Sequence, residues 1–180
     1  MTLSLSSCLR TQSLVSVRRR DVDSNGIQGF LVGLSDDLLA LEYVYDFQVD
    51  GLMVLRRSDI TDVQRTGTDQ FQESLLKKEG IRPGTQVQSP LDLGSWKSIL
   101  VQLSREHKYM ILERELGPAP EFTIGRAIRI TAAQVEIQTF SGTGRWYQKS
   151  ERLRYSQLTC AQVNTRYMSF YQRYFERSAA

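Results

Sequence analysis

Short runs of alternating apolar and polar residues occupy most of the chain, and this period of two is typical of half-buried β-strands. In the first half the runs predict five strands, over residues 13–17, 27–34, 38–45, 52–55 and 60–63. Asn25-Gly26 and Asp50-Gly51 lie between such runs and favour tight turns, because Asn and Gly adopt positive φ at little cost. A helix capped by Thr68 then follows the fifth strand.

The second half repeats this order of elements. Apolar runs predict strands over residues 109–115, 122–130, 135–140, 146–155 and 158–163. A final helix over 165–177 carries an aromatic stripe of Tyr167, Phe170, Tyr171, Tyr174 and Phe175. Another helix, capped by Ser95, precedes these strands, since apolar residues from Trp96 to Leu103 recur at helical spacing.

Gly and Pro, which interrupt helices and strands, are densest just before the middle of the chain. We therefore expect a first unit at 1–80, a linker at 81–94 and a second unit at 95–180. The clearest internal match is residues 58–61 (SDIT) against residues 156–159 (SQLT). Two units with the same order of elements favour an internal duplication.

Composition and charge narrow the class of protein. The 180 residues are 41% hydrophobic and 24% charged, which is ordinary for a globular protein. The 23 basic and 20 acidic residues leave a net charge of +3, a weaker excess than dedicated nucleic-acid domains show. The sequence has no apolar run of the roughly 20 residues that a membrane span needs, and its start does not read as a signal peptide.

The two cysteines, Cys8 and Cys160, are too few for a disulfide framework. We therefore expect a reducing, cytoplasmic location with both thiols packed or idle. A single bridge between the two residues stays open at this point.

Gly29 and Gly33 share one predicted strand, and a second motif runs from Gly51 through an apolar strand to Arg56 and then Ile60. This arrangement resembles the Sm/LSm/Hfq family, which places glycines in its second strand. The family's second motif is likewise a glycine, a hydrophobic strand, an arginine and then an isoleucine. The layout also looks like uncharacterised bacterial proteins with two Sm-like units in tandem.

The resemblance implies a mainly β fold with short helices (β+α). In that fold two tandem SH3-like, Sm-like small β-barrels are each followed by a C-terminal helix. The second half keeps Gly125 and Ile130 of the pattern but fits it less well. Sm-like units leave strand edges exposed, so the resemblance also implies pairing of edges within or between chains.

The sequence departs from the family where RNA would bind. Sm proteins use an Asp and an Asn around the third strand, and these positions fall on Ser35 and Leu39 in the first half. In the second half they fall on Thr131 and Val135. Because an apolar side chain cannot hydrogen-bond a base edge, we expect the family's RNA pocket to be absent from both halves.

For each catalytic, metal-binding or cofactor motif that the sequence suggests, a purely structural role explains the same residues better. Asp21, Asp23 and Asn25 imitate the start of a calcium loop, but the position that needs a bidentate Glu is Val32. His107 is the single histidine and has no motif around it, so we expect a surface residue at a helix end. We expect no enzyme and no cofactor.

Three functional hypotheses then remain: a non-enzymatic interaction or scaffold module, a binder of RNA or single-stranded nucleic acid and, least favoured because recognisable acid–base sets are nearly absent, an enzyme. The basic clusters are the candidate contacts for nucleic acid or a partner: Arg18, Arg19, Arg20, Arg56, Arg57, Arg145, Lys149, Arg152 and Arg154. Tyr167, Tyr171 and Tyr174 form a candidate surface for a protein partner or for the other unit. A protein partner, or self-association through strand edges, is favoured over nucleic acid, and no membrane is expected.

Overall fold

The computed structural model describes residues 4–19, 21–22 and 26–178. The first half contains α1 (Leu5–Thr11), β1 (Leu14–Arg19), β2 (Ile27–Leu34), β3 (Leu38–Tyr45), β4 (Gln48–Arg56), η1 (Arg57–Asp59), β5 (Ile60–Gln64) and α2 (Gly67–Lys78). The second half contains α3 (Trp96–Glu106), β6 (Met110–Arg114), β7 (Glu121–Ile130), β8 (Gln134–Thr139), β9 (Glu151–Arg154), η2 (Tyr155–Gln157), β10 (Cys160–Val163) and α4 (Arg166–Ser178). The fold is therefore mainly β, with antiparallel strands and short helices, as predicted.

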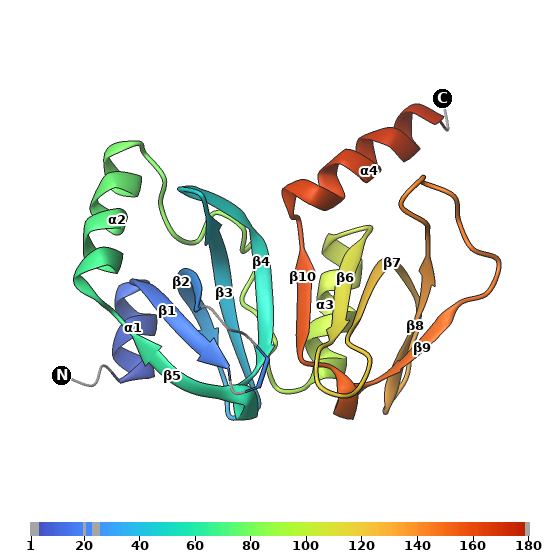
Figure 1. The fold of residues 1–180 in the computed structure, drawn as a ribbon, viewed down its shortest axis with the longest axis horizontal. Helices are drawn as coiled ribbons and strands as arrows, with labels where there is room; N and C mark the ends of the chain where they lie inside the picture. Colours follow the sequence, from blue (N-terminus) through green and yellow to red (C-terminus); the bar gives the residue numbers. More distant parts are fainter. Residues whose placement is uncertain (1–3, 20, 23–25, 179–180) are drawn as a thin grey trace.

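Ten strands of the described chain form one antiparallel sheet in the order β5-β1-β2-β3-β4-β10-β6-β7-β8-β9. The two halves lie side by side and meet where β4 pairs with β10, a junction that we call the seam (Figure 1). The sheet is not closed into a barrel, so the prediction of two closed barrels was wrong in that respect. The physical reason is that β10 takes up the edge of β4, which leaves β5 and β9 at the two ends of the sheet.

The strands of the two halves follow the same order, and local irregularities recur at matching places. The register of β2 against β3 shifts between Leu31 and Gly33, and that of β7 against β8 shifts between Ala127 and Arg129. The short helices η1 and η2 each link the fourth strand of their half to the fifth. The pairing between the second and third strands is therefore irregular at the same position in each half.

The turn after the second strand is also built alike in both halves. The Ser35 hydroxyl accepts a hydrogen bond from the Leu38 backbone N–H at 2.9 Å, while the Ser35 N–H donates to the Leu38 carbonyl at 2.9 Å. The Thr131 hydroxyl and N–H make the same two bonds with Gln134, at 3.2 and 2.9 Å. These residues therefore shape a turn, which is a common use of Ser and Thr side chains.

Alternate residues of β3 and β4 supply two cores on opposite faces of the sheet. Leu38, Ala40, Leu52 and Val54 pack into a cluster with α3 and the strands of the second half. On the other face lie Leu39, Leu41, Met53 and Leu55, packed with α1, and Cys160 of β10 joins them. Each half thus completes a core of the other.

The first-half helix α2 is held by two buried carboxylates. Thr66 caps the helix and forms a capping box with Asp69, two residues earlier than the predicted cap at Thr68. The other Asp69 oxygen accepts hydrogen bonds from Ser16 and Gln28, both at 2.8 Å. Glu73 accepts from the Leu14 backbone N–H at 3.1 Å, so α2 is tied to β1 and β2.

One turn and one strand differ from the sequence prediction. Asp50 and Gly51 lie inside β4, and the turn before that strand is formed by Asp46 and Phe47, which both have positive φ. Gly51 has a φ of 85° within the strand, where its backbone passes close to the Val163 carbonyl of β10. The predicted turn at Asn25-Gly26 falls partly outside the described residues. In the second half β9 is shorter than predicted and begins only at Glu151.

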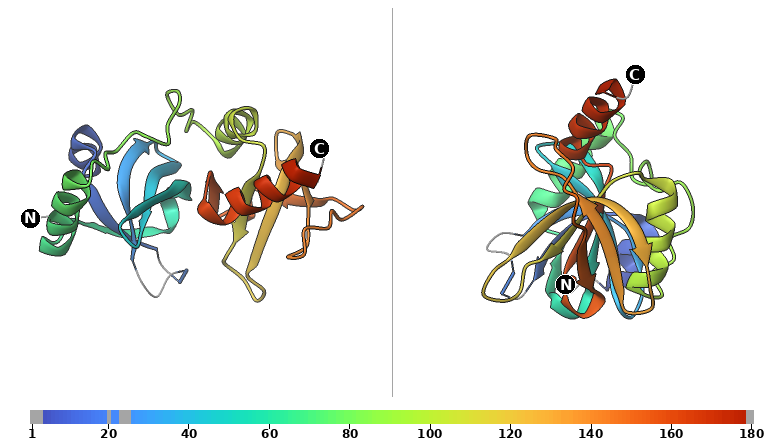
Figure 2. Two further views of the ribbon diagram at one scale, coloured as in Figure 1. Left: turned by 90° about the horizontal axis from the view of Figure 1, so that it is seen from above. Right: turned by 90° about the vertical axis from the view of Figure 1, so that its right-hand side faces the viewer.

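The segment between α2 and α3 runs along one side of the molecule from the first half to the second (Figure 2). The buried Glu42 carboxylate accepts hydrogen bonds from the backbone N–H groups of Gly84 and Gln86, at 2.7 and 2.5 Å. Leu93 is buried in the cluster that includes α3. The segment predicted as a linker is therefore fastened to the sheet at both ends, while the domain boundaries remain a prediction.

Candidate interaction surfaces

The last helix, α4, is anchored by its inner side chains. The Thr165 hydroxyl accepts a hydrogen bond from the Met168 N–H at 3.2 Å and so caps the first turn. Tyr171 and Phe175 face inward and pack against Phe140, with ring centroids 4.9 and 5.0 Å apart. Trp146 closes the same group, 5.0 Å from Phe175. This aromatic cluster holds the helix on the second half.

The outer side of α4 carries large aromatic side chains that remain in contact with solvent. Tyr167, Phe170 and Tyr174 are 50%, 65% and 50% exposed, and Phe122 of β7 lies edge-on to Tyr167 at 6.2 Å. We call these four residues the aromatic face. Of the residues of α4, all of which are described, Met168 is the one that is buried. The helix projects from the top of the second half (Figure 1).

A small hollow of about 240 Å³ lies between the aromatic face and the turn at 142–144. The Tyr171 hydroxyl donates a hydrogen bond to the Gly142 carbonyl at 3.0 Å, which joins helix and turn. Gly144 has a φ of 72°, and a side chain there would run into the Tyr174 ring. A glycine is therefore required for this turn to approach the helix.

Sequence reasoning named Tyr167, Tyr171 and Tyr174 as the candidate surface. The structure places Tyr167 and Tyr174 on the outside, whereas Tyr171 is half-buried and belongs to the anchor. Phe170 is the most exposed member of the aromatic face and was not among the named residues. Its helical spacing from Tyr167 and Tyr174, three and four residues away, places it in the predicted aromatic stripe, although the predicted surface leaves it out.

A second candidate surface is a hollow of about 370 Å³ at the seam. Its walls come from the β2–β3 turn, the start of α3 and both short helices, and include Asp36, Asp37, Arg56, Trp96 and Tyr155. Arg56 bridges the seam, because it donates to both Asp59 carboxylate oxygens at 2.9 Å and to the Ser156 carbonyl at 3.0 Å. A cation, two aromatic rings and two acids thus share one site.

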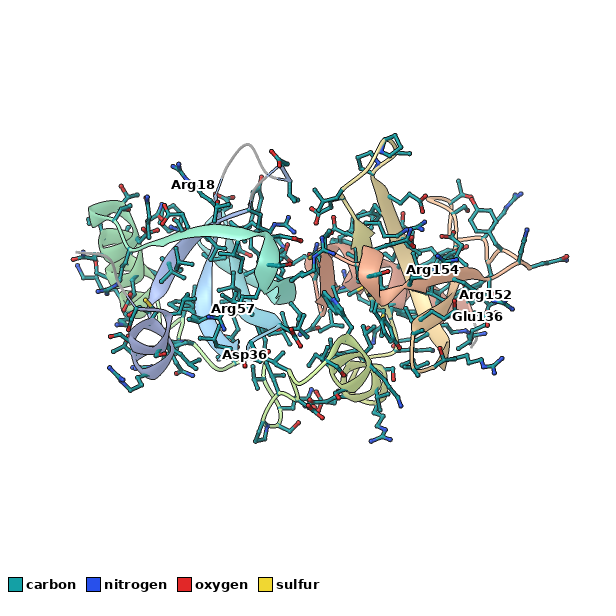
Figure 3. All side chains as sticks on the ribbon, turned by 90° about the horizontal axis from the view of Figure 1, so that it is seen from below. Arg18, Asp36, Arg57, Glu136, Arg152 and Arg154 are labelled. Carbon is teal, nitrogen blue, oxygen red and sulfur yellow. The ribbon has the colours of Figure 1, made fainter. Side chains whose placement is uncertain are left out.

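Figure 3 labels four of the predicted basic contacts: Arg18 and Arg57 in the first half, and Arg152 and Arg154 in the second. Arg57 donates to the Ser35 carbonyl at 2.6 Å, and Arg152 lies 3.7 Å from the Glu136 carboxylate. Arg18, Arg145, Lys149 and Arg154 are exposed. Arg20 lies outside the described residues.

Arg19 has a structural position instead. It is 4% exposed and forms a two-pronged pair with Glu115, at 2.6 and 2.8 Å. Glu115 also accepts from the Thr159 hydroxyl at 2.5 Å. Because Arg19 belongs to β1 and Glu115 follows β6, this pair ties the two halves together, and the buried Arg19 side chain is not available to a phosphate.

One carboxyl group, the half-buried Glu113, and one buried thiol, Cys160, lie beside this pair. Burial and the nearby Glu115 charge raise the pKa of Glu113, which also accepts a hydrogen bond from Gln162. Burial likewise raises the pKa of the Cys160 thiol well above its ordinary range. Cys8 and Cys160 are both buried and free, and both pack in the first-half core.

The positions that the Sm-like pattern uses for RNA are not exposed polar groups. Leu39 and Val135 are fully buried. The hydroxyls of Ser35 and Thr131 are engaged in their turns, and the Ser35 hydroxyl also donates to the Leu93 carbonyl at 2.8 Å. Nothing in either half therefore presents a base-reading side chain at these places.

Other chemistry is sparse in the described part of the chain. There, His, Cys, Asp and Glu side chains form no group of three or more that could hold a metal ion. His107 is half-buried rather than a surface residue, its Nε2 has no hydrogen-bond partner, and burial lowers its pKa. The helices among these residues also include none with the length and apolar character to cross a membrane.

The arrangement as a whole offers two surfaces, an aromatic one on α4 and a mixed one at the seam. Comparison with protein families, with curated proteins and with solved structures gave no match. The two surfaces themselves are therefore the basis on which a function can be argued.

Proposed function

We propose that the protein is a non-enzymatic interaction module that binds a protein partner through the aromatic face of α4. The observation that carries the proposal is the gathering of Tyr167, Phe170, Tyr174 and Phe122 on one side of a projecting helix. Exposed aromatic groups of this kind are typical of protein interfaces, where Tyr and Phe are enriched at the centre. Each ring also has few rotatable bonds, so it loses little entropy on binding.

The position of α4 supports this proposal. The Arg166 backbone N–H donates to the Asp50 carboxylate at 2.6 Å, and its side chain donates to Gln48 at 2.8 Å. Together with the anchor of Tyr171 and Phe175, these bonds fix the helix against both halves. A surface that is already in place favours binding, because less order has to be created when the partner arrives.

We further propose that the two halves are diverged copies of an Sm-like unit and that they serve as the scaffold for α4. The recurring strand order, the matched register shifts and the matched turns support this. Gly29 and Gly125 add to it, since both occupy the same place in the second strand. A side chain at Gly29 would lie 2.7 Å from the Glu42 carbonyl, and one at Gly125 would run into the Gln138 carbonyl.

RNA or single-stranded nucleic acid is the second candidate ligand, and the seam hollow is the observation that favours it. Arg56 could hold a phosphate there, and the half-buried Tyr155 ring could stack on a base. Asp36 and Asp37 line the same hollow, however, and they repel phosphate. The protein partner is therefore the better-supported proposal.

Site-specific photo-crosslinking tests the protein-partner proposal. A photoreactive phenylalanine replaces Phe170 in one variant and Phe71 of α2 in a matched control, because Phe71 is similarly exposed at 63%. We expect a discrete crosslinked protein in cells from position 170 and none from position 71. Adding Tyr167→Ala and Tyr174→Ala should remove that product, and an identical pattern from both positions would refute the role of the aromatic face.

Fluorescence anisotropy with a mixed-sequence RNA tests the alternative. Binding at the seam should weaken steeply as salt is raised and should be lost in Arg56→Ala but kept in Phe170→Ala. No affinity at low salt would remove nucleic acid as a candidate. Tight binding that depends on Arg56 would make it the leading one.

A further inference from the structure

The seam between the halves is made of apolar residues at every paired position but one. In β4, Leu52, Met53, Val54 and Leu55 lie opposite residues 160–163 of β10. All four are buried, as are Cys160, Ala161 and Val163 opposite them, and Gln162 is the polar exception. Pairing these two strands therefore removes two apolar rows from water, one on each face of the sheet.

The strand β9 is the fourth strand of the second half, as β4 is of the first. The far edge of β4 pairs with β10 at the seam, whereas β9 ends the sheet. Leu55 lies opposite Leu39 of β3, and Leu153 lies opposite Val135 of β8, so the two strands can be superposed residue by residue. Residues 53–56 read Met-Val-Leu-Arg and residues 151–154 read Glu-Arg-Leu-Arg. The exposed, charged residues Glu151 and Arg152 thus occupy the places that the buried, apolar Met53 and Val54 have at the seam.

The opposite edge, β5, differs from β10 in a similar way. Val63 lies opposite Val17 of β1, and Ala161 lies opposite Leu112 of β6, which aligns residues 61–64 with residues 159–162. These segments read Thr-Asp-Val-Gln and Thr-Cys-Ala-Gln. Asp62 therefore replaces the fully buried Cys160 at the centre of the strand.

A second copy of the chain would pair its β5 with β9 in the geometry of the seam. Leu153 would then lie opposite Asp62 of the incoming copy, and Arg152 opposite Val63. Both charges would leave water beside an apolar side chain. Arg152 would keep the Glu136 carboxylate 3.7 Å away, but removing this exposed ion pair and the Asp62 carboxylate from water is still unfavourable. Hydrogen bonds between the two strand edges alone would not offset this loss.

We propose that Glu151, Arg152 and Asp62 keep a second copy of the chain from extending the sheet, so that assembly stops at the one internal seam. The proposal reverses the expectation of self-association through strand edges. It also goes beyond the proposed function, because it concerns the ends of the sheet and is independent of α4. Charges on an edge strand are a known protection against unwanted pairing.

To test this proposal, a triple variant (Glu151→Met, Arg152→Val and Asp62→Ala) introduces apolar residues like those of the seam at both edges. Light scattering after gel filtration gives its mass, and amide hydrogen exchange reports on residues 60–64 and 151–154 at low and high protein concentration. We expect the mass of the variant to rise with concentration. Exchange in both segments should slow by at least about tenfold as the edges pair.

Wild-type protein should show no concentration-dependent protection in either segment, even if it associates through another surface. A matched control, Glu121→Met with Arg129→Val, adds the same apolar side chains to β7, whose two edges are already paired. Arg152→Val alone, a milder change, should give the same effect more weakly. Protection of β5 and β9 in wild-type protein, or a folded triple variant with unprotected edges, would overturn the proposal.

Discussion

At the scale of single residues, Gly51 shows how one position can decide whether the halves join. Its φ of 85° suits glycine, and its backbone lies so close to the Val163 carbonyl that a side chain would meet β10. Two constraints therefore favour glycine at position 51: the positive φ of its own backbone, and the close approach of β10. Only the first of these is local in sequence. The contact with β10 joins positions more than a hundred residues apart in the chain.

We predict that Gly51→Ala lowers the free energy of unfolding by at least about 2 kcal/mol, because strain and overlap act together. Urea unfolding measures the change. Gly67→Ala is the control, since a side chain at Gly67 would have no neighbour within 4 Å. The control should unfold at the wild-type urea concentration or slightly above it, and equal losses in the two variants would contradict this account.

At the scale of elements, α2 depends on buried carboxylates for its attachment. Burial by itself would raise the pKa of Asp69, but hydrogen bonds from Gln28, Thr66 and Ser16 outweigh it and hold that pKa below the ordinary 3.8. The folded state therefore favours the carboxylate. Its stabilising effect is complete above the unfolded pKa and is lost as the pH falls through the depressed folded value.

We predict that Asp69→Asn lowers the free energy of unfolding by about 1–3 kcal/mol at neutral pH. The difference from wild type should shrink as the pH falls below 3.8, because the wild-type carboxylate then becomes protonated as well. Denaturant unfolding at a series of pH values measures it, with the exposed Asp36→Asn as the control for loss of one charge. A difference that stays constant down to low pH would show that the carboxylate charge has no part in holding α2.

Most elements could be predicted from local pattern, and the exceptions have non-local causes. The strand over 38–45 was confirmed to the residue, because its apolar run ends at turn residues on both sides. Asp50-Gly51 looks like a turn in sequence, yet it lies inside β4, where the pairing with β3 is irregular between Glu42 and Val44. Phe47, which has positive φ in the actual turn, carries no turn signal at all. Of the two candidate surfaces, the aromatic stripe on α4 could be predicted from helical spacing in the sequence. The seam hollow could not, because its walls come from segments of both halves that are far apart in the chain.

At the scale of the whole molecule, the seam makes the halves interdependent. Cys160 of the second half packs in the first-half core, and four residues of β3 and β4 pack in the other cluster. The buried pair of Arg19 and Glu115 links the halves again. Neither half therefore has a complete core without its neighbour.

We predict one cooperative unfolding transition for the chain. Trp96 and Trp146 both report on the second half through fluorescence, whereas far-ultraviolet circular dichroism reports on both halves. The two signals should give the same midpoint and the same slope in urea. A circular dichroism curve with an extra step that fluorescence lacks would instead mean that the first half unfolds on its own.

The late position of β10 in the sequence has a consequence for how the protein is made. On the ribosome, β1 to β5 emerge long before residues 160–163, which pair with β4 and supply Cys160 to the first core. The nascent chain therefore waits with an apolar strand uncovered, at the stage when misassociation is most dangerous. Final folding therefore has to follow the exit of those four residues from the tunnel, and pairing across so long a separation makes that step slow.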